Sequence, residues 1–63
     1  MMNNFDAIGI TSGLMQVNTH EEDLEAWQTL VDTGLVWKLG SKYIKTAKRL
    51  IEIGAIKNDE ERN

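Results

Sequence analysis

The side chains of this sequence that could do chemistry fall into two charged groups and a short tail, residues 58–63, that holds three acids and one arginine. Residues 1–37 hold six Asp and Glu residues and no Lys or Arg, whereas residues 38–57 hold six Lys and Arg residues and one acid, Glu52. Solvated carboxylates along a helix do not form a general acid–base pair, and the sequence has neither a glycine-rich phosphate loop nor a nucleophile motif. We therefore expect no enzymatic activity, and we look to the charged groups for binding.

Metal and cofactor sites are not expected either. The sequence has no cysteine and a single histidine, His20, so a zinc site within one chain would need carboxylates for every other ligand. No apolar run approaches the roughly 20 residues that span a bilayer, and the first residues lack the basic region of a signal peptide. The sequence thus predicts no metal, no cofactor, no membrane association and a cytoplasmic location.

The basic group has a helical spacing. Lys42, Lys45 and Arg49 fall at i, i+3 and i+7 and would share one strip of a helix, beside Lys48, which would suit a phosphate backbone. Against nucleic acid, the whole chain carries a net charge of −3, and the start of this helix lacks the Asn or Gln residues that read bases. A charged partner protein and an ordinary solvated surface therefore remain as alternatives.

Aromatic and apolar side chains indicate protein binding more directly. We expect Trp27 to lie in the core, whereas Trp37, in a connecting segment, is either core or interface. Trp and Tyr are frequent interface anchors, and a chain of 63 residues cannot easily enclose every large apolar side chain. The candidate partner-binding residues are Trp37, Tyr43, Ile53, Lys42, Lys45 and Arg49, and the candidates on an acidic face are Glu21, Glu25 and Asp32.

Two helices are predicted in the first half of the chain. A short helix from about Asn4 to Ser12, ended by Gly13, is favoured over a hairpin that would run through Val17. The second helix starts after Thr19, whose hydroxyl can accept the free amides of a first turn, and acidic residues follow where the helix dipole favours negative charge. Its apolar face comprises Leu24, Trp27, Leu30 and Val31.

A glycine at position 34 should end the second helix in a left-handed conformation. Residues 35–39 are too apolar for a solvated loop and predict one or two helical turns under the core. Ser41 is the expected N-cap of a last helix, residues 42–53, which Gly54 closes. The apolar face of this helix comprises Tyr43, Ile44, Ala47, Leu50 and Ile51.

Together these elements predict an all-α fold, a small three-helix domain with a short helical linker between the second and third main helices. The domain should span residues 1–57, followed by a frayed acidic tail at 58–63, and Leu30, Trp37 and Leu50 should share one neighbourhood. A chain of this size buries only about 60% of the surface that its unfolded form exposes. The thin core and the complementary acidic and basic faces favour a homodimer.

The sequence contains Ala26-Trp27-Gln28, the run from Leu30 to Trp37, and Thr46-Ala47 with Leu50-Ile51. Through these motifs, residues 24–56 resemble an uncharacterised family of short phage-encoded proteins, and Ser12 to Met15 is similar to the end of that family's first helix. The chain departs from the family at residues 40–45, where the family tends to have a glycine, an aromatic pair and Gly-Arg. The resemblance implies no activity and no functional residue.

The resemblance implies a phage origin, and from this we expect an accessory protein of the host cytoplasm that binds a protein stoichiometrically and inhibits a host or anti-phage defence factor. The alternative is a small nucleic-acid-binding regulator that uses the basic face of the last helix. A structural component of the virus particle would be a third class.

Overall fold

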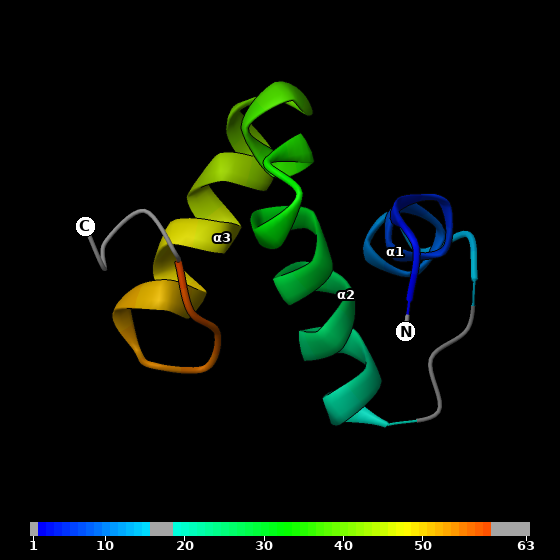
Figure 1. Cartoon of the computed structure of the whole chain (residues 1–63), viewed down its shortest axis with the longest axis horizontal. Coiled ribbons are helices and arrows are strands. Elements are labelled where there is room, and N and C mark those ends of the chain that lie inside the picture. The colour runs from blue at the N-terminus through cyan, green and yellow to red at the C-terminus, as the bar shows by residue number, and fades with distance from the viewer. Residues whose placement is uncertain (1, 16–18, 59–63) are drawn as a thin grey trace.

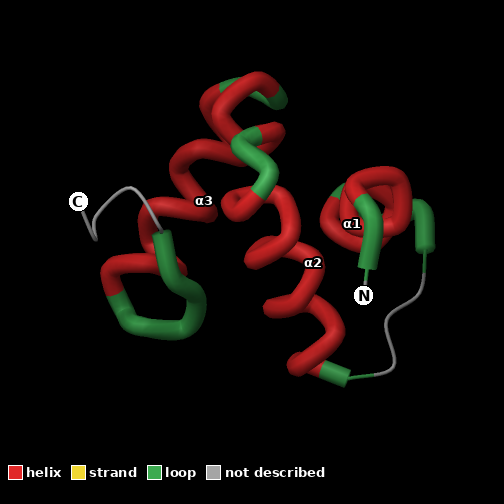
Figure 2. Tube along the Cα trace, viewed as in Figure 1, coloured by secondary structure: helices red, strands yellow, loops and turns green. Residues whose placement is uncertain are grey.

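A computed structural model describes residues 2–15 and 19–58 of the chain. These ranges contain three α-helices and one 3-10 helix and no strand. Figures 1 and 2 show how the helices are arranged. The elements are α1 (Asn4–Thr11), α2 (His20–Asp32), η1 (Leu35–Lys38) and α3 (Ser41–Glu52). The prediction of an all-α fold with three main helices and a helical linker is confirmed.

The first helix, α1, begins at a side-chain cap. The Oδ1 atom of Asn3 accepts a hydrogen bond from the backbone N–H of Asp6 at 2.8 Å, which satisfies one of the free amides of the first turn. The helix ends at Thr11, one residue earlier than predicted, and Gly13 follows with a φ of 86°. The hairpin alternative is therefore wrong for these residues, and its last position, Val17, lies outside the described residues.

The second helix, α2, begins and ends where the sequence predicts. The Oγ1 atom of Thr19 accepts the backbone N–H of Glu22 at 3.1 Å. At the other end Gly34 has a φ of 79°, and its N–H donates to the carbonyl of Val31 at 3.1 Å. Both the Thr19 cap and the glycine stop are confirmed.

The start of α3 differs from the prediction. Its N-cap is Gly40, which makes no side-chain capping bond, and Ser41 is already the first helical residue. Gly40 has a φ of 112°, a backbone conformation that residues with a Cβ rarely adopt. The chain turns at this glycine as it leaves η1, so the helix begins one residue earlier, and the predicted N-cap role of Ser41 is wrong.

The end of α3 is a Schellman motif, which consists of two backbone hydrogen bonds around a glycine in the left-handed conformation. The N–H of Gly54, whose φ is 80°, donates to the carbonyl of Ile51 at 3.0 Å, and the N–H of Ala55 donates to that of Leu50 at 2.9 Å. Gly54 thus closes the helix as predicted, the chain reverses after it, and Ile56 returns to the core, where it is buried.

The core lies between the helices and the η1 segment. Leu30 and Val36 are its largest fully buried side chains, and Trp37 and Leu50 are partly buried against it. The expected grouping of Leu30, Trp37 and Leu50 is thus confirmed. The complete set of buried hydrophobic residues is Ala7, Ala26, Trp27, Leu30, Val31, Val36, Ala47 and Ile56.

The three helices are not equally close. The backbones of α1 and α2 approach closely, whereas α3 makes its main backbone contacts with η1, and Figure 1 shows α2 and α3 diverging from the η1 end. Large side chains fill the wider gap between α2 and α3. The ring centroids of Trp27 and Tyr43 lie 5.3 Å apart, with an angle of 45° between the ring planes. The predicted core position of Trp27 is confirmed.

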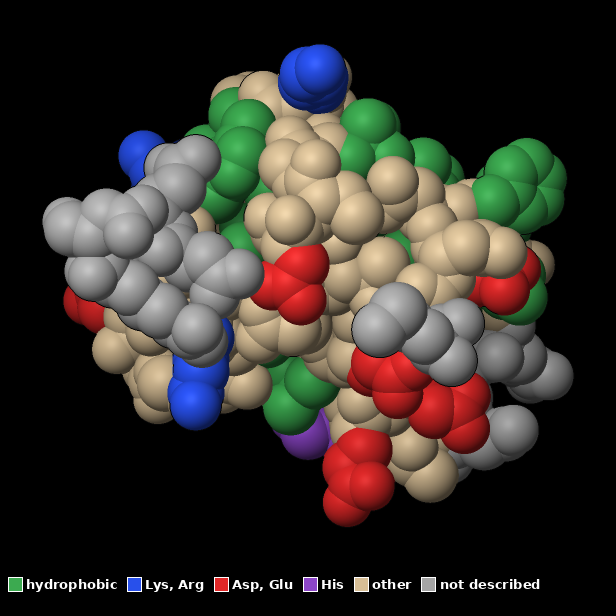
Figure 3. Space-filling model, viewed as in Figure 1, with side chains coloured by type: hydrophobic (Ala, Val, Ile, Leu, Met, Phe, Trp, Pro, Cys, Tyr) green, Lys and Arg blue, Asp and Glu red, His purple; other side chains and the backbone are tan. Residues whose placement is uncertain are grey.

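Some apolar side chains stay outside this core, as expected for so short a chain. Ile53 is 65% exposed, and Phe5, Leu14 and Met15 are also exposed. Hydrophobic side chains appear on the visible face in Figure 3 among the charged ones.

Candidate functional site

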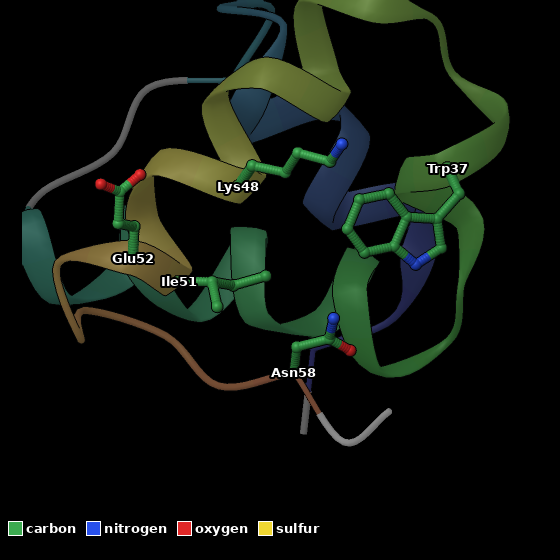
Figure 4. A pocket seen from close by; sticks show the side chains of 5 residues that line it. All are labelled: Trp37, Lys48, Ile51, Glu52 and Asn58. Carbon is green, nitrogen blue, oxygen red and sulfur yellow. The ribbon is translucent and has the colours of Figure 1, made fainter. Parts of the chain in front are cut away.

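A hollow with a volume of about 480 Å³ opens between η1, α3 and the segment that follows α3. Its lining residues, which Figure 4 labels, are Trp37, Lys48, Ile51, Glu52 and Asn58. We refer to it as the Trp37 hollow.

The Trp37 hollow has both apolar and charged side chains around it. In Figure 4 the indole ring of Trp37 lies on the η1 side and Ile51 lies between it and the α3 backbone. The Lys48 side chain extends from α3 toward Trp37, whereas the carboxylate of Glu52 points away from Trp37. The hollow therefore combines an apolar surface with a cationic rim.

Trp37 is held in place by the turn that ends α2. The left-handed Gly34 redirects the chain into η1, and the backbone N–H of Trp37 donates to the Gly34 carbonyl at 3.3 Å. The neighbouring Val36 is fully buried and anchors the segment, while Trp37 itself is only partly buried against the core. One side of the indole thus remains available to the hollow.

The segment after α3, which contributes Asn58 to the hollow, is fixed by Gln28 of α2. The Nε2 atom of Gln28 donates to the Lys57 carbonyl at 2.7 Å, and the Lys57 N–H donates to Gln28 Oε1 at 2.7 Å. The same Nε2 donates to Asp32 Oδ1 at 2.8 Å. Gln28 therefore positions this wall of the hollow without lining it.

A second hollow, of about 340 Å³, lies between the end of α1, the side of α2 and the start of α3, and it is lined by Thr11, Ser12, Trp27, Lys42, Tyr43 and Thr46. Its threonine hydroxyls already donate hydrogen bonds to backbone carbonyls of their own helices. Thr11 donates to the Ala7 carbonyl at 2.9 Å, and Thr46 donates to the Lys42 carbonyl at 3.1 Å. The Tyr43 and Thr11 hydroxyl oxygens lie 3.4 Å apart. These hydroxyls are already hydrogen-bonded within α1 and α3 or between them, so we favour the Trp37 hollow as the candidate site.

The predicted binding residues do not gather in one place. Trp37 lines the first hollow, while Tyr43 and Lys42 line the second, and Ile53 is exposed beyond the end of α3 and lines neither hollow. Lys45 and Arg49 are exposed on α3, but the cation that borders the Trp37 hollow is their neighbour Lys48. The acidic candidates are exposed on α2: Glu21, Glu25 and Asp32.

Sequence reasoning did not assign Ile51, Glu52, Asn58 or Gln28 to a binding site. Ile51 was assigned to the core face of its helix, yet it also faces the hollow. Asn58 was assigned to the tail, and Gln28 was noticed only as part of the Ala26-Trp27-Gln28 motif. A glutamine directly after a buried tryptophan was the one available signal, but its partner lies 29 residues away.

The described ranges contain no group of three or more metal-ligating side chains placed to hold an ion. Within the same ranges, no helix has both the length and the apolar character needed to cross a membrane.

A family model described as a domain of unknown function, DUF7417, matches residues 8–62. The chain belongs to this family. The DUF7417 match covers Gln28 and every residue that lines the Trp37 hollow, whereas the Asn3 cap and the exposed Phe5 precede it. Neither a curated protein nor a solved structure matches the chain.

Proposed function

We propose that this member of the DUF7417 family acts by binding another protein stoichiometrically, through the surface around Trp37, and not as an enzyme. The observation that carries the proposal is the partly buried indole of Trp37 at the edge of a hollow with a cationic rim. Interface anchors are commonly aromatic side chains in pockets surrounded by polar groups. A chain with this arrangement needs no catalytic group to occupy a partner's surface.

The proposed target is a host or anti-phage defence protein in the host cytoplasm, which the binder inhibits by occupying it. Support for this part comes from the resemblance of residues 24–56 to short phage-encoded proteins. Blocking a larger protein requires only a stable complementary surface, and a domain of 63 residues can supply one.

The experiment is affinity capture from infected cells, followed by purification of the captured protein and calorimetric titration with this chain. We expect one defined stoichiometry, and we expect Trp37→Ala to weaken binding by at least about tenfold, the effect of losing roughly 1.4 kcal/mol at an interface anchor. Ile53→Ala is the matched control, because Ile53 is exposed but does not line the hollow. Failure of any captured protein to form a stoichiometric complex would refute the proposal.

We also propose that the protein forms a homodimer. Supporting this, the acidic candidates lie exposed on α2 while the basic residues lie exposed on α3, so the acidic face of one copy complements the basic face of another. Light scattering at low micromolar concentration should give twice the mass of the chain. A monomer mass under these conditions would contradict it.

Nucleic-acid binding is the second candidate function, favoured by the exposure of all four basic residues of α3: Lys42, Lys45, Lys48 and Arg49. Three or four phosphate contacts should retard a DNA or RNA fragment in a gel at about 50 mM salt and release it as salt rises. The absence of retardation at that salt concentration would eliminate this candidate.

A further inference from the structure

We infer that the Trp37 hollow binds a large apolar side chain carried by an acidic segment of the partner protein. This inference rests on the proposed function and adds the chemistry of the partner. Two separate features support it, the shape of the apolar surface and the charge around it.

The apolar surface is formed before any partner binds. Trp37 and Ile51 both pack against the core. Trp37 belongs to the 3-10 helix η1 and Ile51 to the α-helix α3, and the hydrogen bonds within each helix fix its backbone. The volume of about 480 Å³ lies within the range of pockets for small molecules, roughly 300–1,000 Å³. One leucine or aromatic side chain can therefore enter without a rearrangement of the backbone.

The charge at the rim selects the residues that flank this side chain. Lys48 borders the hollow and forms no ion pair with any residue in the described ranges. The remaining exposed cations of α3 extend the positive surface: Lys42, Lys45 and Arg49. The one acid of the lining, Glu52, points away from Trp37 in Figure 4. Carboxylates of a partner therefore meet a cation that has no ion-pair partner within the described ranges, which favours association and correct orientation.

The overall charge distribution favours a short acidic segment over a nucleic acid. The molecule extends 33 × 22 × 20 Å and has a net charge of −3, with six of its ten acids before residue 38. A long polyanion laid on α3 would continue past the acidic side chains of α2 and be repelled there. A segment of a few residues contacts α3 and η1 alone.

The test is a titration of the isotope-labelled chain, followed by NMR amide and indole N–H shifts, with two synthetic hexapeptides. One is Asp-Glu-Leu-Trp-Glu-Asp, and the other replaces its Leu-Trp pair with Ser-Ser. We expect the first to shift the Trp37 indole N–H and the amides of Lys48 and Ile51, with a dissociation constant below about 1 mM, near −4 kcal/mol. The second should bind at least about tenfold more weakly, because it cannot fill the apolar surface. Equal shifts from both peptides would overturn the inference.

Two charge reversals separate the hollow from the general positive surface of α3. Lys48→Glu should weaken the first peptide by about tenfold, whereas Lys45→Glu, the same change on the same helix outside the hollow, should weaken it by no more than about twofold. Equal losses would show only general attraction and would refute the hollow. Stronger shifts of the same signals by an oligothymidine than by the peptide would refute an acidic partner in favour of nucleic acid.

The inference and the proposed function can fail separately. A captured partner that binds Lys48→Glu as tightly as the wild type, together with no peptide shifts at Trp37, would refute the inference and leave protein binding intact. Shifts from the peptide without any stoichiometric partner would refute the proposed function and leave the ligand preference of the hollow intact.

Discussion

The side-chain amide of Gln28 pairs with the backbone of Lys57 in both directions, with two N···O distances of 2.7 Å. A primary amide has both an N–H donor and a carbonyl acceptor, as a peptide group does. The Gln28 side chain can therefore form the same pair of hydrogen bonds with the Lys57 backbone that a neighbouring β-strand would form. The pair holds the segment after α3 against α2, with Ile56 buried on one side of it and Asn58 beside the Trp37 hollow.

Removal of this pair should loosen the end of the domain. Gln28→Ala deletes both hydrogen bonds to Lys57 and should lower the free energy of unfolding by about 1 kcal/mol, since each bond contributes roughly 0.5–1.5 kcal/mol and this pair is solvent-exposed. Hydrogen exchange of the Lys57 amide should accelerate. Glu25→Ala, an exposed α2 position, is the control and should change stability by less than about 0.5 kcal/mol. Unchanged protection of the Lys57 amide in Gln28→Ala would contradict the role of the pair.

The left-handed backbone at Gly34 should resist any side chain. Gly34→Ala at a φ of 79° should cost about 1 kcal/mol or more, because a Cβ is disfavoured in this conformation. For a domain of this size that corresponds to a fall of roughly 4–8 °C in Tm. Circular dichroism melting measures it, and Gly34→Asn should lose less, because asparagine tolerates this region better than alanine. Equal melting of both variants and the wild type would contradict the strain argument.

Leu30 should dominate the stability of the core. Leu30→Ala removes a fully buried side chain and should cost about 2–5 kcal/mol. The total stability of 63 residues is of order 3–9 kcal/mol, so this variant should lose a large fraction of it and unfold at a much lower urea concentration than the wild type at 25 °C. Ile53→Ala is the comparison, since Ile53 is 65% exposed, and it should lie within about 0.5 kcal/mol of the wild type. Similar losses at the two positions would be inconsistent with the core described above.

The two expected helix caps should behave differently. Thr19→Ala removes the acceptor of the Glu22 amide and should lower stability by about 1 kcal/mol. Ser41→Ala changes a first-turn residue that follows the Gly40 cap and should have an effect below about 0.5 kcal/mol. Urea unfolding of both variants measures the difference in stability. A larger loss of stability from Ser41→Ala than from Thr19→Ala would show that Ser41 is the N-cap of α3 after all.

The helix ends show which part of the fold was predictable. Thr19, Gly34 and Gly54 act through bonds to residues within a few positions, so their roles could be inferred from local sequence. The Ser41 cap was wrong because the conformation of Gly40 depends on how η1 packs, which no local pattern encodes. The assignment of Trp27 to the core also followed from helical periodicity.

By itself, the sequence determined where the helices run, which faces are apolar and how charge divides between the two halves, because these follow from neighbours three or four residues apart. Only the tertiary structure decided that Trp37, Lys48 and Ile51 would border one hollow and that Gln28 would fix its far wall. The physical reason is separation along the chain: the Gln28–Lys57 pair joins residues 29 positions apart, and such contacts depend on how α3 and the segment after it pack against α2.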